Sequence, residues 1–443
     1  MCYVSGMTAQ QMRDKIIDDR NLIFDEEIID RDFSFSEVKN MATVLVGARR
    51  TGKSSYLRLF ARKMIDEGLE KEKVCYLSFF GLEDEEIRFS EIERAYYSLY
   101  PELDSARDVW FLLDEVQNVL FWGEGVSKLM DEHKCHVVVS GSSARYLSTD
   151  RSTELRGRSI PYRFYPLSFR EFCRFNGFDA EPSQSYDSFH RNKLSALYKD
   201  YLRRGSYPAL ATVDNPTIRK MVLSTYFDLA YSRDIIDRFE ITKGTMLKHL
   251  MKRLVKNSGR PYSVNSLVHH LKSSGYNTSN ELVSSYIDII KDTCFFHEVR
   301  FFGTEKQQNV NHKKLYTIDP AMAVLYREFD DSVGIRLEHA VLMDLVRLGK
   351  DVFYYRDEAG KEADFIMVDE DTHPLAIIQV TDHLADNAMR EIDGCRSAMK
   401  NLGLKESFIV TNDEFYPGRT EFDEGTIRII PAWRFSLNTS VVL

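Results

Sequence analysis

Short apolar segments alternate with longer amphipathic segments through the first 175 residues of the chain. The apolar segments are rich in β-branched and aromatic residues, which is typical of strands buried on both faces of a sheet. Four strands are predicted, at residues 43–46, 74–79, 109–113 and 136–140. Helical periodicity lies between them, at residues 54–67 and 91–100. This alternation predicts an α/β fold with a parallel sheet and helices on both of its faces.

The pattern changes after residue 185. Apolar residues recur at helix spacing up to residue 240. Two helices (263–273 and 278–290) and two strands (295–302 and 314–318) follow, which is the order of a winged helix-turn-helix. The last part predicts a second, smaller α/β domain, with helices at 337–348 and 385–402 and strands at 352–355, 363–368, 376–381 and 407–411.

A phosphate-binding motif follows the first predicted strand. Residues 47–54 fit the pattern G-x-x-x-x-G-K-[ST]. In such a loop the backbone N–H groups wrap a phosphate chain, and the positive end of the next helix points at the same charge. We expect Lys53 to reach the β- and γ-phosphates of ATP and Ser54 to bind Mg²⁺. The predicted nucleotide contacts are Gly47, Ala48, Arg49, Arg50, Thr51, Gly52, Lys53, Ser54 and Ser55.

Two acids, Asp114 and Glu115, end the third predicted strand. In phosphoryl transfer one acid holds Mg²⁺ and another polarises the attacking water. Asp114 is therefore predicted as a metal ligand and Glu115 as the general base. An acidic strand end is also common without any catalytic role. The preceding phosphate loop, at the spacing of a neighbouring sheet strand, favours catalysis.

Hydroxyl and guanidinium groups near the fourth predicted strand extend this site. Ser142 is the first candidate to orient water between the nucleotide and Glu115, and Ser143 is the second, although the same stretch is typical of a turn. Downstream, Arg156 or Arg158 can stabilise charge on the γ-phosphate, in cis or from a neighbouring protomer. Solvated surface arginines fit the sequence equally well.

Composition narrows the class of protein. The 443 residues predict two to four domains, and the six cysteines, without a C-x-x-C pair, predict reduced thiols in a cytoplasmic protein. Neither a signal core nor an apolar run of about 20 residues is present, so no membrane contact is expected. A net charge of −9 argues against coating nucleic acid through bulk charge, and it leaves a local basic patch open.

The motifs together resemble prokaryotic AAA-type P-loop ATPases that carry a winged-helix segment and a C-terminal restriction-endonuclease-like domain. Residues 47–54, 112–115, 140–143 and 154–158 carry the resemblance, and residues 205–208 with Asp234 and Arg238 resemble the family's linking region. The resemblance implies ATP hydrolysis and an ATP-dependent homo-oligomer. It implies an AAA-type core at 1–180, a helical linker or lid at 181–240, a winged helix at 241–325 and a restriction-endonuclease-like domain at 326–443.

The winged-helix segment is a candidate for contact with DNA or with a protein. Its second helix contains Glu281 and Asp288 and no basic residue, which weakens major-groove readout, so packing as a lid or protein-contact module is slightly preferred. The candidate DNA contacts are Lys252, Arg253, Lys256, Arg260, Lys306, Lys313 and Lys314.

The C-terminal domain departs from the PD-(D/E)xK nuclease pattern that it resembles. Asp364 fits the first acid of that pattern, and Glu338 is a candidate accessory acid. Gln379 replaces the second acid and Thr381 replaces the lysine. Because Gln binds Mg²⁺ poorly and Thr has no charge, we expect a scaffold or substrate-binding module without nuclease activity.

Three functions fit these patterns. The leading one is a Mg²⁺-dependent ATPase whose nucleotide cycle rearranges the distal domains, acting on DNA or on a protein partner. The second is a nucleotide-gated DNA- or protein-binding switch with negligible turnover. The third is an ATP-regulated nuclease, against which Gln379 and Thr381 count.

Overall fold

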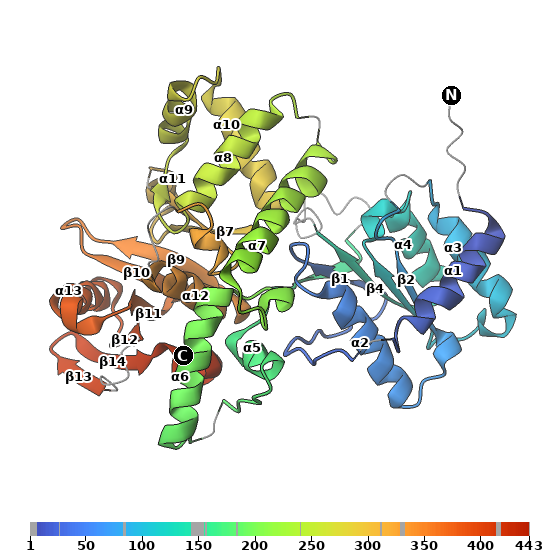
Figure 1. The fold of residues 1–443 in the computed structure, drawn as a ribbon, viewed down its shortest axis with the longest axis horizontal. Helices are drawn as coiled ribbons and strands as arrows, with labels where there is room; N and C mark the ends of the chain where they lie inside the picture. The colour runs from blue at the N-terminus through green and yellow to red at the C-terminus, as the bar shows by residue number, and fades with distance from the viewer. Residues whose placement is uncertain are drawn as a thin grey trace. The chain divides into compact units, whose positions relative to one another are not determined.

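The computed structural model describes residues 7–25, 27–82, 86–142, 155, 157–182, 185–239, 241–310, 312–327, 333–412 and 418–442. The chain divides into two compact units (Figure 1). The first comprises Met1–Phe164 with Asp292–Cys294, and the second comprises Tyr165–Lys291 with Phe295–Leu443. Each unit has its own β-sheet. None of the helices in these described ranges combines the length and the apolar character that a bilayer crossing needs.

The first unit is built on a five-stranded parallel sheet of order β2-β3-β4-β1-β5. The strands are β1 (Ala42–Val46), β2 (Val74–Ser78), β3 (Trp110–Asp114), β4 (His136–Gly141) and β5 (Ser159–Arg163). The helices are α1 (Ala9–Asn21), α2 (Lys53–Asp66), α3 (Phe89–Leu99) and α4 (Trp122–Glu132). This is the P-loop NTPase arrangement that the sequence predicted.

The four predicted strands of the first unit are confirmed to within one residue at each end. The sequence did not predict β5, which pairs with β1 at the edge of the sheet. Pro161 lies in this strand, and proline is tolerated in a sheet chiefly on an edge strand. Because only one side of β5 is paired and most of its residues are partly exposed, it lacks the apolar signature of a central strand.

An aromatic cluster covers α2 and the β5 edge of this sheet. Phe33 lies 5.1 Å from Tyr56 and 4.9 Å from Phe164, measured between ring centroids. Phe35 makes tilted ring contacts with Phe60 and Tyr162, with centroids 5.0 Å and 6.0 Å apart. The segment before β1 is thereby fixed against the helix that follows the phosphate loop. Edge-to-face aromatic pairs add about 1 kcal/mol each beyond the apolar area they bury.

The second unit contains a nine-stranded mixed sheet of order β13-β14-β12-β11-β10-β9-β7-β8-β6. Its strands are β6 (Pro261–Tyr262), β7 (Phe296–Phe301), β8 (Lys313–Thr317), β9 (Asp351–Arg356), β10 (Glu362–Val368), β11 (Pro374–Thr381), β12 (Glu406–Thr411), β13 (Gly418–Phe422) and β14 (Gly425–Pro431). Its helices are α5 (Phe169–Phe175), α6 (Ser188–Arg204), α7 (Pro216–Tyr231), α8 (Gly244–Lys256), α9 (Val264–Ser273), α10 (Asn280–Asp292), α11 (Glu305–Val310), α12 (Val333–Arg347), α13 (Leu384–Leu402) and α14 (Ala432–Val442).

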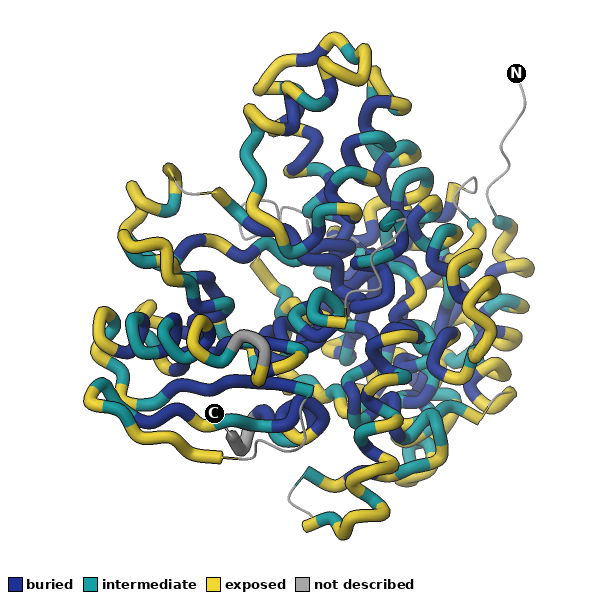
Figure 2. Tube along the Cα trace, turned by 60° about the vertical axis from the view of Figure 1, so that its left-hand side comes forward, coloured by how far each residue is buried: buried dark blue, intermediate teal, exposed yellow. Residues whose placement is uncertain are grey.

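The helices and hairpin expected for a winged helix occur in the predicted order: α9, α10, β7 and β8. The hairpin does not stand apart, however, because β7 pairs in parallel with β9 through Arg300–Phe353 and Phe301–Tyr354. The two sequence-predicted parts 241–325 and 326–443 therefore share one sheet. The winged-helix and restriction-endonuclease-like assignments stay predictions. The inner strands β1, β3, β11 and β12 are mostly buried, and buried segments are dark blue in Figure 2.

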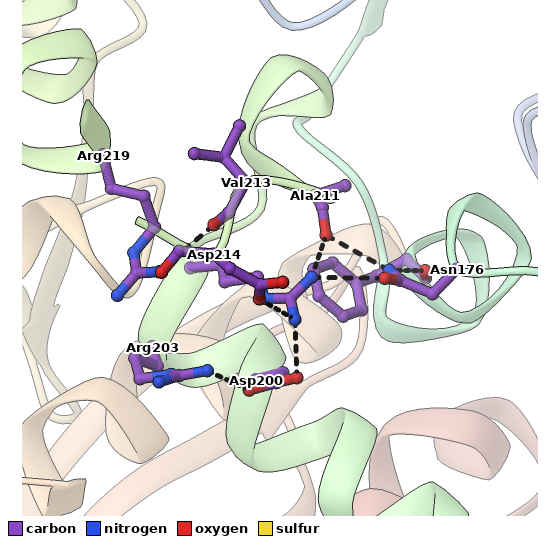
Figure 3. Close-up of polar contacts among 9 residues, drawn as sticks. Asn176, Asp200, Arg203, Ala211, Val213, Asp214 and Arg219 are labelled. Carbon is purple, nitrogen blue, oxygen red and sulfur yellow. Dashed lines mark hydrogen bonds and ion pairs between the residues drawn. The ribbon is translucent and has the colours of Figure 1, made fainter. Parts of the chain in front are cut away.

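The end of α6 is held by a polar network around Arg204, and Figure 3 labels its partners Asp200, Ala211 and Asp214. The guanidinium of Arg204 donates to the Ala211 carbonyl at 2.9 Å and to Asp200 at 2.8 Å, and it also pairs with Asp214. Arg203 pairs with the same Asp200 carboxylate at 2.6 Å. These contacts fix the direction in which the chain leaves α6.

The turn after α6 is tied to the end of β8 by one buried carboxylate. Asp319 accepts hydrogen bonds from the backbone N–H and the hydroxyl of Ser206, and from the N–H of Met322. Gly205 has φ 91°, and a Cβ there would lie 2.6 Å from the Asp319 carboxylate. This position therefore requires glycine for both conformation and space.

Candidate nucleotide-binding site

The predicted phosphate loop lies between β1 and α2, and its two required glycines have separate structural reasons. A Cβ on Gly47 would lie 2.1 Å from the Phe164 carbonyl oxygen, so no side chain fits there. Gly52 caps the start of α2 in the left-handed conformation, with φ 100°. The strand, loop and helix predicted around the motif are confirmed.

Lys53 is buried at the first residue of α2 and folds back over its own loop. Its ammonium donates to the carbonyl oxygens of Gly47 at 2.8 Å and Ala48 at 3.0 Å. Thr51 closes the same turn by donating its hydroxyl to the Ala48 carbonyl at 3.0 Å. Both of these partners of the buried ammonium are carbonyl oxygens of the loop itself.

Arg31, a cation from outside the motif that was not predicted, also contacts this loop. Arg31 donates to the carbonyl of Thr51 at 2.9 Å, and its guanidinium lies 4.6 Å from the centroid of the Phe164 ring. Arg31 belongs to the segment before β1 that the aromatic cluster fixes. No local pattern marks this residue, and the neighbouring alternation of Phe33 and Phe35 is the only available signal.

The predicted metal pair, Ser54 and Asp114, meets at the carboxyl edge of the sheet. Asp114 is buried at the end of β3. Burial raises the pKa of Asp114 above its usual range, and the charge of Glu115 adds to this. Hydrogen bonds from Ser140 and Ser54 and the charge of Lys53 act in the opposite direction. The Ser54 hydroxyl and the Asp114 carboxylate are hard oxygen donors, which suit Mg²⁺.

The strand that carries Asp114 is not the neighbour of the phosphate-loop strand. β4 pairs with both β1 and β3 and lies between them. The sequence-based expectation of neighbouring strands is therefore wrong. The acid pair reaches the loop because parallel strands end at the same edge, not because the two strands are adjacent.

Glu115 occupies an unusual backbone position directly after β3. Its φ is 54°, a left-handed conformation that is uncommon for residues other than glycine. The Glu115 N–H donates to the Ser140 hydroxyl at 3.2 Å, and its carboxylate accepts a hydrogen bond from the side-chain amide of Gln117. The Ser140 hydroxyl therefore holds the backbone of Glu115, and the Gln117 amide holds the carboxylate that was predicted as the general base.

Ser140 is the residue of the Ser-Gly-Ser-Ser stretch that contacts both acids, and the sequence did not single it out. Its hydroxyl donates to Asp114 and accepts from Glu115, so it connects both acids. Ser142, the predicted residue, is fully buried just after β4. Ser143 lies outside the described residues. The available signal was the β3–β4 register, which pairs Leu113 with Val139 and so places Asp114 beside Ser140.

Arg158, the downstream arginine that the structure describes, does not join this site within one chain. The Arg158 carbonyl accepts from the N–H of Ala42, at the first residue of β1, and its guanidinium pairs with Asp131 at 2.6 Å. The phosphate loop follows the other end of β1, about 15 Å away along a strand of this length. The expectation that Arg158 acts in cis is therefore wrong. Arg156 lies outside the described residues, and action of either from another protomer stays a prediction.

The acidic residues of the C-terminal part bond to one another and to neighbouring groups. Asp364 accepts from the Val380 N–H at 2.8 Å, and the side chain of Gln379 bridges the Asp364 N–H and Glu391. Loss of water, and then the charge of Glu338, raises the pKa of Asp364 well above its usual range. Thr381 donates to the carbonyl of His383 at 3.3 Å.

A lysine does reach this acidic group, from another strand. Lys314 on β8 is buried and pairs with Glu362 at 2.7 Å. Its predicted role as an exposed DNA contact on the wing is therefore wrong. Lys313 lies 3.8 Å from Glu298. Among the described residues, the ligand atoms of Asp, Glu, His or Cys side chains gather closely enough for a metal ion only at Glu93, Glu132 and His133, outside this group.

Comparisons with known proteins support the first unit's assignment. Residues 39–173 match a family model described as an AAA domain, and residues 195–332 match one described as a domain of unknown function. The chain is 27% identical over 444 residues to the uncharacterized protein MJ1544 of Methanocaldococcus jannaschii, covering 98% of this chain and 97% of that protein. It is 27% identical over 398 residues to an uncharacterized protein of Haemophilus influenzae, covering 88% of this chain and 93% of that protein.

Similarity to solved structures is low. The Orc1 protein of Aeropyrum pernix, solved in complex with DNA, matches at 12% identity with a TM-score of 0.31, covering 71% of this chain and 91% of that chain. AMPPCP-bound DnaA from Aquifex aeolicus matches at 13% identity with a TM-score of 0.24, covering 58% of this chain and 83% of that chain. TM-scores this low carry no functional weight. The match of residues 39–173 to the AAA domain model agrees with the phosphate-loop geometry of the first unit.

Proposed function

We propose that the first unit is a Mg²⁺-dependent ATPase whose nucleotide state is transmitted to the rest of the chain. One observation carries the proposal: Lys53, Ser54, Asp114 and Glu115 converge at one edge of the parallel sheet, with Ser140 between the two acids. Each has the chemistry that phosphoryl transfer needs, because the reaction depends mainly on positioning and on stabilising charge.

Cations and backbone donors bind the triphosphate in this proposal. The ammonium of Lys53 exchanges its two carbonyl partners for phosphate oxygens, and the N–H groups at the start of α2 face the same anion. Ser54 and Asp114 are the residues that would hold Mg²⁺, which neutralises phosphate charge when bound. The charge of a bound cation favours the ionised form of Asp114, against the effect of burial.

Glu115 is the general base. Its carboxylate accepts the proton of the attacking water, while the Gln117 amide and the Ser140 hydroxyl fix its side chain and backbone. A base held in one orientation contributes more than a mobile one, because the geometry of proton transfer is set before the reaction begins.

The proposal assigns partner binding to the second unit. Residues 241–325 are the proposed contact with DNA or with a protein, and an ATP-dependent homo-oligomer is part of the same proposal. Lys314 of the predicted basic wing is paired with Glu362, so fewer exposed cations remain for contact with DNA. This favours a protein partner for the segment.

Two variants test the catalytic assignment. Lys53→Ala should lose ATP binding, measured by isothermal titration with Mg·ATP. Glu115→Gln should keep binding and lower phosphate release by about a hundredfold or more. Glu102→Gln, an exposed acid of the same unit, is the matched control and should behave like the parent protein. Wild-type turnover in both Lys53→Ala and Glu115→Gln would refute the ATPase.

The same measurements separate an ATPase from a nucleotide-gated switch. A switch binds ATP through Lys53 but releases negligible phosphate even before Glu115 is changed. Adding DNA to the wild-type assay then tests whether DNA is the partner. DNA can stimulate phosphate release only if it binds this protein.

A further inference from the structure

A cavity of about 530 Å³ lies at the amino-terminal edge of the five-stranded sheet. The segment before β1 and the first residues of β3 and β4 form its walls. The phosphate loop and the acid pair lie at the carboxyl edge of the same sheet, so the cavity is separate from that site. Its volume is in the range of pockets that hold small molecules.

Unpaired positive charge gathers at this cavity. Three cationic side chains line it and have no hydrogen-bond or ion-pair partner among the described residues: Lys39, Arg107 and Lys134. Neighbouring charges are paired, by contrast. Lys73 binds Asp108 at 2.9 Å, and the single acid that lines the cavity within the described ranges, Glu37, pairs with His136 at 2.9 Å. In a chain of net charge −9, such a local excess of cations selects for an anionic ligand.

A stacked pair of aromatic rings lies beside these cations. Trp110 and His136 are register partners at the starts of β3 and β4. Their rings stack with centroids 4.4 Å apart and planes 12° apart. Val38 and Met41 add apolar surface to the same walls. An aromatic surface next to lysine and arginine is the combination that binds a base by stacking and its phosphate by charge.

We propose that this cavity binds a nucleotide unit, with its base against the Trp110–His136 pair and its phosphate on Lys39, Arg107 and Lys134. The ligand chemistry is the same for a free mononucleotide and for one nucleotide of a single strand of nucleic acid. The site is independent of the phosphate loop and requires no residue of the ATPase.

Tryptophan fluorescence can locate the ligand. The chain has three tryptophans, so the double substitution Trp122→Phe/Trp433→Phe leaves Trp110 as the only one. Lys53→Ala is added so that the phosphate loop does not compete for the probe. Thymidine monophosphate and a short oligothymidylate are titrated separately. Saturable quenching by both identifies a free nucleotide as a sufficient ligand, and quenching by the oligonucleotide alone identifies a strand. Absence of saturable quenching by either overturns the proposal.

Charge reversal tests the cations. Lys39→Glu and Lys134→Glu should each weaken binding of the fluorescein-labelled oligothymidylate about tenfold and lower the slope of log affinity against log salt by about 1. Lys71→Glu is the matched control, since it makes the same change of charge on an exposed lysine of the same unit outside the cavity. An equal loss in Lys71→Glu, or no loss in Lys39→Glu and Lys134→Glu, overturns the proposal.

Discussion

The hydroxyl of Ser140 donates a hydrogen bond to the buried carboxylate of Asp114. The same oxygen accepts a hydrogen bond from the backbone N–H of Glu115 at 3.2 Å. One side chain on β4 therefore sets the positions of both acids at the end of β3.

Ser140→Ala should lower the rate of ATP hydrolysis and the apparent affinity for Mg²⁺ by about tenfold or more. Loss of a hydrogen bond that orients a metal-binding carboxylate typically has an effect of this size. Phosphate release measured against Mg²⁺ concentration checks it. Ser142→Ala is the comparison variant, and a larger loss in Ser142→Ala than in Ser140→Ala would restore the residue that the sequence favoured.

Gln117→Met should lower the turnover number about tenfold and leave ATP affinity unchanged. Methionine keeps the length and apolar volume of glutamine but cannot donate to the Glu115 carboxylate, so the base loses its fixed orientation. Single-turnover hydrolysis with a parallel binding titration separates the two quantities. A change in affinity with unchanged turnover would contradict a positioning role.

Asp319→Ala should destabilise the second unit by about 3 kcal/mol, because it leaves the buried N–H groups of Ser206 and Met322 without an acceptor. Urea unfolding followed by fluorescence measures the loss. Asp371→Ala, which removes an exposed acid of the same unit, should change stability by less than about 0.5 kcal/mol. Similar losses in both variants would show that Asp319 does not join the turn to β8.

Asp344 predicts a pH dependence of stability. Burial raises the pKa of Asp344 to about 7, against the charge of Arg347 and a hydrogen bond from Ser436. Between the unfolded value near 4 and this folded value, the folded state binds more protons than the unfolded state. The contribution of Asp344 to stability is therefore fully present at low pH and is lost as pH rises toward 7.

Asp344→Asn removes this titration. From pH 5 to pH 8, the unfolding free energy of the wild type should fall by about 3 kcal/mol relative to that of the variant. Burial also lowers the pKa of His339 to about 4, which has the opposite pH dependence, but His339 is present in both proteins and cancels in the difference. A difference that stays constant with pH would contradict the raised pKa of Asp344.

The sequence was sufficient where the chemistry is local. The phosphate loop and its flanking strand and helix lie within one short stretch, and each buried strand of the first sheet has a continuous apolar run. Ser140 was missed because its role depends on the register between two strands. Arg31 was missed because its partner, Thr51, is brought to it by folding rather than by spacing.

Lys314 was predicted as an exposed DNA contact, but it is buried. Its position in a predicted hairpin suggested an exposed wing, but the pairing of β7 with β9 places that hairpin inside a large sheet. Glu362, on β10, then becomes the partner of Lys314. Pairing between strands that are 50 residues apart has no signature in the local pattern of either strand, so the burial of Lys314 could not be predicted.

Strands β3 and β4 run from the amino-edge cavity to the carboxyl edge of the same sheet. Trp110 and His136 begin these strands, and Asp114 and Ser140 lie at their other ends. A ligand at the amino edge and ATP at the carboxyl edge would therefore contact opposite ends of the same two strands. Thermodynamic linkage then requires reciprocity: if a ligand at the amino edge alters ATP affinity by some factor, ATP alters the affinity of that ligand by the same factor.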